Sequence, residues 1–287
     1  MHSGDEQPRT VASRDGMPIA VWETGAGPPL LLIHGAAADH RRWDPVVPAL
    51  AQHFRVLTID RRGRGGSGDA DDYAIDREYD DVAAVVEWAG RDTNVLGHSY
   101  GGMCALEAAL RTDSIGKLIL YEPPMGFLVS SPEVVKRLEE LLDAGERDEL
   151  VAFFMREVAG VADHQVEVMR SMPAWEARLA VARTIPREES ASRQYRFDPD
   201  RWRGVEVPTL LLEGGDSAAP FKEADRALLA ALPHCQIAVL PGQRHTAMDT
   251  APELFLSEVL DFLASDEPPS PQPADDGSGH GRRQPAG

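Results

Sequence analysis

The chain has 287 residues, of which 47 are acidic and 29 are basic, so its formal net charge is −18. An acidic surface repels the phosphates of nucleic acids and of anionic lipids, which argues against nucleic-acid binding and against membrane binding. Hydrophobic residues make up 43% of the chain, enough to bury a full core, and no apolar run reaches the length of a membrane-spanning helix.

The N-terminus and the cysteines bear on where the protein works. The first residues are acidic and lack the basic and apolar regions of a signal peptide. The two cysteines, Cys104 and Cys235, lie in apolar surroundings, which favours reduced core residues over a disulfide or a metal cluster. We therefore expect a cytoplasmic protein.

The two ends of the chain are expected to lie outside the folded core. Residues 1–8 are interpreted as a flexible arm. Residues 265–287 are rich in proline, glycine and serine and contain no large apolar residue, so they cannot bury enough surface to offset their ordering entropy. We expect a disordered tail there.

Between these ends, short apolar runs alternate with helical patterns, which predicts a mainly parallel sheet with helices on both faces. The expected strands are Ile19–Glu23, Leu30–His34, Val56–Asp60, Asn94–His98, Lys117–Tyr121, Thr209–Glu213 and Gln236–Leu240. The expected helices of this part are Arg41–Gln52, Asp76–Ala89, Tyr100–Arg111, Phe221–Ala231 and Pro252–Leu263. We assign residues 9–122 and 205–264 to one α/β core, whose ligands would bind beyond the carboxyl ends of the strands.

The stretch 123–204 interrupts this alternation. It contains helical patterns and no convincing strand, and its expected helices are Pro132–Leu142, Asp148–Ala159 and Ala174–Arg183. An all-helical insertion between two core strands is typical of a cap over the strand ends. Most of its apolar residues are expected to form the cap's own core, with a few facing the cleft.

A nucleophile motif, Gly97-His98-Ser99-Tyr100-Gly101, lies between an expected strand and an expected helix. A G-x-S-x-G pattern in this setting predicts a nucleophile elbow with Ser99 as the nucleophile. The turn is so tight that the flanking residues must be small, and Gly97 and Gly101 meet that demand. The elbow also places the hydroxyl at a helix N-terminus, where backbone N–H groups favour developing negative charge.

A serine hydroxyl needs a base to take its proton. His245 is the best placed of the nine histidines, because it follows the last expected strand at its carboxyl end. The base in turn needs a carboxylate. Asp216, which follows the strand Thr209–Glu213, is the first choice. Glu122, which ends the strand Lys117–Tyr121, is the alternative acid.

The tetrahedral intermediate of acyl transfer needs two N–H donors, which form an oxyanion hole. One is expected to be the backbone N–H of Tyr100, the residue after the nucleophile. The other is expected in the loop after the strand Leu30–His34, where small side chains leave the backbone accessible. Ala36 is the first choice and Ala37 the second.

Together these residues resemble the α/β-hydrolase superfamily, in its capped branch with a serine nucleophile, over about Val11–Ala264. The matching pieces are His34-Gly35, the loop from Asp60 to Gly68, the elbow, Gly215-Asp216 and His245. The resemblance implies the α/β-hydrolase fold, with a mainly parallel central sheet, helices on both faces and a helical cap after the sixth core strand. It also implies a Ser-His-Asp triad, as in esterases and cofactor-free haloperoxidases, whereas the dehalogenase and epoxide-hydrolase branches carry an aspartate nucleophile.

The segment from Gly63 to Gly68 also matches G-x-G-x-x-G, a dinucleotide-binding pattern. Such a site would need a helix to begin within the glycines. Instead the chain continues with Asp69, Asp71 and Asp72, and a helix is expected only near Asp76. We therefore expect no organic cofactor, and nothing in the motifs implies a metal.

These features predict a serine hydrolase that cleaves a small, largely apolar carboxylic ester, lactone or thioester through an acyl-enzyme on Ser99. The expected partner is accordingly a small-molecule acyl substrate. The same triad fits C–C bond hydrolysis or cofactor-free perhydrolysis of the haloperoxidase kind. A receptor-like protein that binds a small molecule and turns it over slowly is the alternative of another class.

Overall fold

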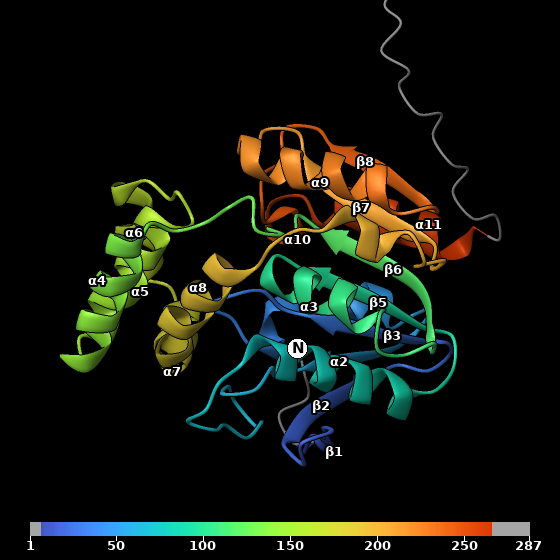
Figure 1. Ribbon diagram of the computed structural model, residues 1–287, viewed down its shortest axis with the longest axis horizontal. Coiled ribbons are helices and arrows are strands. Elements are labelled where there is room, and N and C mark those ends of the chain that lie inside the picture. Colours follow the sequence, from blue (N-terminus) through green and yellow to red (C-terminus); the bar gives the residue numbers. More distant parts are fainter. Residues whose placement is uncertain (1–6, 266–287) are drawn as a thin grey trace, which may run out of the picture.

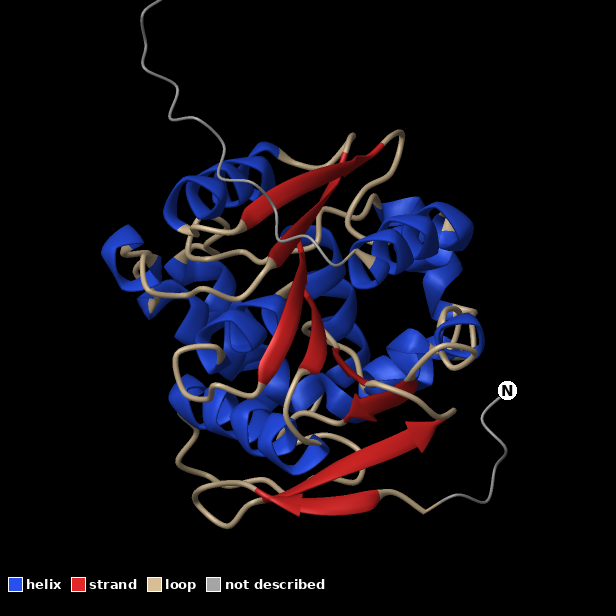
Figure 2. Ribbon diagram, turned by 90° about the vertical axis from the view of Figure 1, so that its right-hand side faces the viewer, coloured by secondary structure: helices blue, strands red, loops and turns tan. Residues whose placement is uncertain are grey.

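A computed structural model of the protein describes residues 7–265 and has an eight-stranded sheet at its centre (Figure 1; Figure 2). In chain order the strands are β1 (Arg9–Ala12), β2 (Pro18–Thr24), β3 (Pro29–Ile33), β4 (Arg55–Ile59), β5 (Thr93–His98), β6 (Ile115–Tyr121), β7 (Thr209–Gly214) and β8 (Cys235–Leu240). Across the sheet their order is β1-β2-β4-β3-β5-β6-β7-β8. The pairs β1–β2 and β2–β4 are antiparallel and all the others are parallel, which confirms the mainly parallel sheet.

The central strands are covered on both faces, which explains their continuous apolar sequences. Along β3, Leu31 and Ile33 join one buried cluster, whereas Leu30 and Leu32 join another. The helices on the first face are α2 (Ile75–Ala89), α3 (Tyr100–Ala108) and α9 (Ala219–Ala231). Those on the second face are η1 (His40–Trp43), α1 (Val47–Leu50), α10 (Ala247–Thr250) and α11 (Pro252–Ala264).

Between β6 and β7 the described chain forms helices only. They are α4 (Pro132–Asp143), α5 (Arg147–Glu157), α6 (Asp163–Arg170), α7 (Ala174–Val181), η2 (Ala182–Thr184), α8 (Ile185–Gln194) and η3 (Pro199–Trp202). We call α4 to α8 the helical insertion; in Figure 1 it stands to the left of the sheet, in green to yellow. Phe154, Met155 and Trp175 are buried in its own apolar cluster, as expected, whereas Met172 is exposed.

The structure differs from the predicted elements in a few places. The edge strand β1 was not predicted, since its four residues are too few to show a period. The expected helix Arg41–Gln52 is only η1 and the short α1, because Pro45 and Pro48 interrupt the backbone hydrogen bonds of a longer helix. Two helices of the insertion, α6 and α8, were also missed.

The predicted flexible arm and disordered tail fall largely at residues 1–6 and 266–287, which lie outside the described residues. Within residues 7–265, no helix combines the length and the apolar character that a membrane crossing requires.

Gly101, in the first turn of α3, gives a test of the fold. A Cβ at this position would overlap the backbone carbonyl oxygens of Ile33 and His34, which cannot move without shifting β3. We expect Gly101→Ala to lower the free energy of unfolding by about 1–3 kcal/mol, the usual cost of overpacking. Urea denaturation measures this value. Gly204→Ala, whose added Cβ would have no atom within 4 Å, is the control; equal losses in the two variants would contradict the prediction.

Candidate active site

Ser99 lies where the chain turns from the end of β5 into α3. Its backbone has φ 54° and ψ −124°, a conformation that costs a residue with a side chain about 1–3 kcal/mol. A Cβ on Gly97 would lie 2.6 Å from the carbonyl oxygen of Gly101, so the two flanking residues must lack side chains. The structure therefore contains the strained strand–turn–helix geometry that a nucleophile elbow requires.

His245 lies in the loop between β8 and α10, and its ring is held by a buried carboxylate. Nδ1 of His245 is 2.6 Å from Oε2 of Glu122. The other oxygen of Glu122, Oε1, accepts a hydrogen bond of 2.7 Å from the backbone N–H of Gly214. Because an ionised carboxylate only accepts, Nδ1 carries the hydrogen of the neutral ring and Nε2 is the basic nitrogen.

The acid in this pair is the alternative candidate, which corrects the expectation that Asp216 holds the histidine. Asp216 does follow β7, but it is exposed, and its backbone N–H bonds the carbonyl oxygen of Gln243 at 2.9 Å. Glu122 is fully buried at the end of the adjacent strand β6, and its φ of 48° turns the chain sharply there. Both acids follow neighbouring strands, and the side chain that reaches the imidazole is that of Glu122.

Tyr121, the last residue of β6, holds both the serine turn and the histidine loop. Its carbonyl oxygen accepts a hydrogen bond of 2.8 Å from the backbone N–H of Ser99. Its hydroxyl donates to the carbonyl of Arg244 and accepts from the N–H of Ala247 at 3.0 Å. The residues on both sides of His245 in this loop are thus tied to the strand that carries the acid.

Two residues that contact the histidine were not predicted. Nε2 of His98 is 2.8 Å from the carbonyl oxygen of His245, and the two ring centroids are 4.5 Å apart. Burial, together with the charges of His245 and Arg42, holds the pKa of His98 well below its usual value, so this ring is neutral. Phe221, near the start of α9, stacks on His245 with centroids 4.4 Å apart. An apolar residue near a helix start is too ordinary to mark this role in the sequence.

The backbone groups expected to bind an oxyanion lie near the serine. A Cβ on Gly35 would lie 3.0 Å from Cβ of Ser99, so the loop after β3 passes directly beside this serine. Ala36 and Ala37 follow in that loop, and Tyr100 begins α3. Their donation of hydrogen bonds to an oxyanion stays a prediction.

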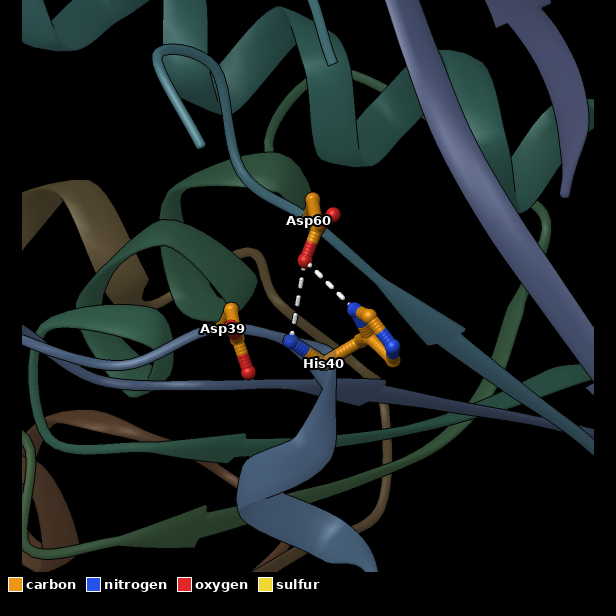
Figure 3. Close-up of side chains that lie close together, drawn as sticks. All are labelled: Asp39, His40 and Asp60. Carbon is orange, nitrogen blue, oxygen red and sulfur yellow. Dashed lines mark hydrogen bonds and ion pairs between the residues drawn. The ribbon is translucent and has the colours of Figure 1, made fainter. Parts of the chain in front are cut away.

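A separate polar cluster lies where the end of β4 meets the start of η1. Figure 3 shows Asp39, His40 and Asp60, whose potential ligand atoms all lie within 4.8 Å of one another. Oδ1 of Asp60 accepts from the backbone N–H of His40 at 3.0 Å and bonds its Nδ1 at 2.8 Å, and Oδ2 accepts from Gly66 at 2.8 Å. Asp39 binds Arg41. Because these oxygens already hold the loop through hydrogen bonds, they fit a structural cluster better than a metal site.

The glycine-rich loop closes on its own chain. The N–H of Gly63 bonds the carbonyl of Gly68 at 2.8 Å, and the N–H of Gly68 bonds the carbonyl of Pro18 at 2.8 Å. A Cβ on Gly65 would overlap the carboxylate of Asp60. The glycines therefore make room for this carboxylate, and these amides do not face a space for a pyrophosphate.

A hollow of about 840 Å³ lies between α2, α3 and α8. Tyr73, Tyr195 and Arg187 are among the residues that line it, whereas Ser99 and His245 are not. This hollow is distinct from the cluster around the serine.

Comparison with known proteins defines the family. The profile of the family described as "Alpha/beta hydrolase family" matches residues 30–258. The chain belongs to this family. This hydrolase is 35% identical to an α/β hydrolase from Sphaerobacter thermophilus, whose structure covers 89% of this chain and 100% of its own with a TM-score of 0.80. The resemblance stated from the motifs and the predicted fold class are therefore confirmed, and the protein is a hydrolase.

Curated relatives have several activities. The chain is 29% identical to the pimeloyl-[acyl-carrier protein] methyl ester esterase of Nitrosospira multiformis, over 85% of this chain and 97% of that protein. It is 26% identical to the 2-hydroxy-6-oxo-6-(2'-aminophenyl)hexa-2,4-dienoic acid hydrolase of Metapseudomonas resinovorans, over 87% and 88%. The matches cover 97% and 88% of these two relatives.

This hydrolase buries a further acid near Glu122. Asp225 lies one turn along α9 from Phe221; it is fully buried, and neither of its oxygens has a hydrogen-bond partner among the described residues. Burial, and then the charges of Glu122 and Glu213, raise the pKa of Asp225 to about 8. The side chain is therefore mostly protonated at neutral pH in the folded protein.

The raised pKa of Asp225 predicts a pH dependence of stability. The folded protein holds this proton more tightly than the unfolded chain, so the stabilisation is complete below pH 3.8 and is lost as the pH rises through about 8. Asp225→Asn keeps the shape and carries no charge. Relative to the wild type, we expect its free energy of unfolding to rise by about 1.4 kcal/mol per pH unit within this window.

Urea denaturation at pH 5, 7 and 9 measures the difference. Glu223→Gln, on the exposed side of the same helix, is the matched control and should differ from the wild type by a constant amount. A constant difference for Asp225→Asn as well would contradict the prediction.

Proposed function

We propose that this hydrolase cleaves a small, largely apolar carboxylic ester, lactone or thioester through an acyl-enzyme on Ser99. The observation that carries the proposal is the 2.6 Å hydrogen bond between Nδ1 of His245 and the buried carboxylate of Glu122. It is combined with a strained serine at a helix N-terminus and a loop of small residues beside it. These are the parts that acyl transfer requires.

In the proposed reaction, Oγ of Ser99 attacks the carbonyl carbon while Nε2 of His245 takes the hydroxyl proton. Glu122 stabilises the imidazolium that forms. The N–H groups of Tyr100 and Ala36 donate to the oxyanion of the tetrahedral intermediate. As the intermediate collapses, His245 returns the proton to the leaving alcohol or thiol. Water, deprotonated by His245, then attacks the acyl group, releases the acid and restores the serine.

C–C bond hydrolysis is the second candidate, supported by the likeness to the dienoic acid hydrolase of Metapseudomonas resinovorans. A carbon leaving group must gain a proton on carbon before it departs, whereas an ester needs only the steps above. The ester proposal is therefore simpler, and it agrees with the likeness to a methyl ester esterase. A panel of aryl esters, thioesters and ring-fission diketones separates the two reactions by their relative kcat/KM.

The first test of the mechanism is covalent labelling. We expect a fluorophosphonate to modify Ser99, because this reagent reacts with an activated serine, and mass spectrometry of the labelled peptide identifies the site. Ser99→Ala should lose the label and reduce p-nitrophenyl ester hydrolysis by at least about 1,000-fold. Ser171→Ala, in the helical insertion, is the control and should keep both. Labelling that persists in Ser99→Ala would overturn the proposal.

The second test concerns the acid. Glu122→Gln keeps the size of the side chain but offers an amide to Nδ1 of His245, which favours the wrong ring tautomer. We expect kcat for a p-nitrophenyl ester to fall by about 100-fold or more. Asp216→Asn is the matched control and should leave kcat nearly unchanged. The opposite ranking of the two variants would return the role to Asp216.

A further inference from the structure

Arg61 follows Asp60 at the end of β4, and its side chain is only 1% exposed. None of the proposed catalytic steps uses it. A buried guanidinium is costly unless its N–H groups find acceptors, so its partners indicate what it holds in place.

The first partner of Arg61 is the peptide between Gly35 and Ala36. The carbonyl of Gly35 accepts from Nη2 of Arg61 at 3.1 Å and from Nδ1 of His34 at 2.8 Å. A trans peptide is planar, and its C=O and N–H point in opposite directions. Holding the Gly35 carbonyl therefore fixes the direction of the Ala36 N–H. Two donors on the carbonyl also polarise the peptide and make this N–H a stronger donor.

The backbone of Arg61 also binds the loop that follows β3. Its N–H donates to Nε2 of His34 at 3.2 Å, so this ring accepts at Nε2 and donates at Nδ1. Burial, together with the charges of Arg61 and Arg64, keeps the pKa of His34 well below its usual value. The ring is therefore neutral, as this pattern of one donor and one acceptor nitrogen requires.

The second partner is Tyr100, which carries the other proposed oxyanion donor. Cζ of Arg61 lies 4.6 Å from the centroid of the Tyr100 ring. The Tyr100 hydroxyl bonds that of Tyr73 at 2.7 Å, and Tyr73 donates to Oε1 of Glu78 at 2.7 Å. Oε2 of Glu78 accepts from Nη1 of Arg61 at 2.8 Å, so this chain of hydrogen bonds leads from Tyr100 back to Arg61. The ring of Tyr100 is therefore held at its face and at its hydroxyl.

The third partner belongs to the helical insertion. Glu188 of α8 is fully buried, and its Oε1 accepts from Nη2 of Arg61 at 3.0 Å and from Arg64. In Figure 1, α8 stands on the side of the insertion that faces the sheet. Burial opposes ionisation of Glu188, but the two arginines hold its pKa below the usual value, so it is charged. Ala37 is buried in the apolar cluster of the insertion, and Ala36 packs against it.

We propose that Arg61 is a positioning residue for the oxyanion hole, and that Glu188 makes this positioning depend on the docking of the helical insertion. This inference rests on the proposed acyl-transfer function. Arg61 holds the Gly35–Ala36 peptide by a hydrogen bond and the Tyr100 ring by stacking, so it sets the two N–H donors relative to each other. Movement of α8 away from Arg61 would remove one of its acceptors and loosen both contacts.

Arg61→Lys tests the inference, because an ammonium keeps the charge but cannot replace the planar fork that serves Gly35, Glu78 and Glu188 together. The oxyanion hole acts on the transition state, so we expect kcat for a p-nitrophenyl ester to fall about tenfold or more while KM changes by less than about threefold. The Kd of an alkyl boronic acid, which forms a tetrahedral anion on Ser99, should rise by a similar factor. The Kd of the matching planar amide should change little.

Arg62→Lys is the matched control for loss of a buried arginine. Arg62 is the next residue, is equally buried, and pairs with Asp81 at 2.6 Å and Asp15 at 3.0 Å, toward α2 and the β1–β2 turn. Arg62→Lys should lower the free energy of unfolding without changing the ratio of boronic acid to amide affinity. This ratio separates a positioning role from a structural one.

Glu188→Gln tests the link to the insertion, because it removes the charge and leaves the contact of Arg61 with Gly35. We expect kcat and boronic acid affinity to fall together, by less than in Arg61→Lys. The double variant should resemble Arg61→Lys alone, since both changes act through the same contacts. Independent, multiplicative losses in the double variant would overturn the proposed link.

The outcomes distinguish the inference from the function on which it rests. If the wild-type protein is neither labelled by a fluorophosphonate nor active on esters, the proposed function fails. If the wild type is labelled at Ser99 and folded Arg61→Lys keeps the wild-type ratio of boronic acid to amide affinity, Arg61 is structural and the inference fails. If Arg61→Lys does not fold, the same ratio in Glu188→Gln decides.

Discussion

The geometry of the candidate active site depends on the end of β6. There the carbonyl of Tyr121 accepts from Ser99 at 2.8 Å, its hydroxyl holds the loop around His245, and the next residue, Glu122, bonds the imidazole at 2.6 Å. Because β5 and β6 are parallel neighbours, a serine turn after one and an acid after the other arrive at the same edge of the sheet. This arrangement needs positive φ at Ser99 and Glu122, and the fully buried strands beneath supply the stability that tolerates such strain.

Much of this arrangement could be predicted from the sequence, for identifiable physical reasons. Strands covered on both faces require continuous apolar runs, and a tight elbow requires small residues on both sides of Ser99, so both leave clear patterns. The acid does not. Glu122 and Asp216 both follow adjacent strands, so strand position does not distinguish them, and the φ of 48° that turns the chain at Glu122 leaves no side-chain pattern. Contacts such as that of Phe221 with His245 arise from packing between distant segments, so the sequence pattern does not predict them either.

The charged contacts around Arg61 differ in kind from the apolar contacts of the three buried clusters. Apolar burial is strong but has no direction, so by itself it does not fix where the insertion sits on the loop that it covers. The pair between Arg61 and Glu188 has fixed donors and acceptors, with an Nη2–Oε1 distance of 3.0 Å, and it tolerates little displacement. The desolvation cost of buried charges offsets much of the energy of such a network, so the pair is weak evidence for stability.

The two ends of the insertion join β6 and β7, which are neighbours in the sheet. A segment attached in this way is easily exchanged during evolution, since a loop of another length joins the same two strand ends with little added entropic cost. In this protein the buried guanidinium of Arg61, which pairs with Glu188 of the insertion, limits that freedom. A transplanted segment without an acid at the place of Glu188 would leave the buried guanidinium of Arg61 paired with Glu78 but with no acid from the insertion, so the two positions constrain each other.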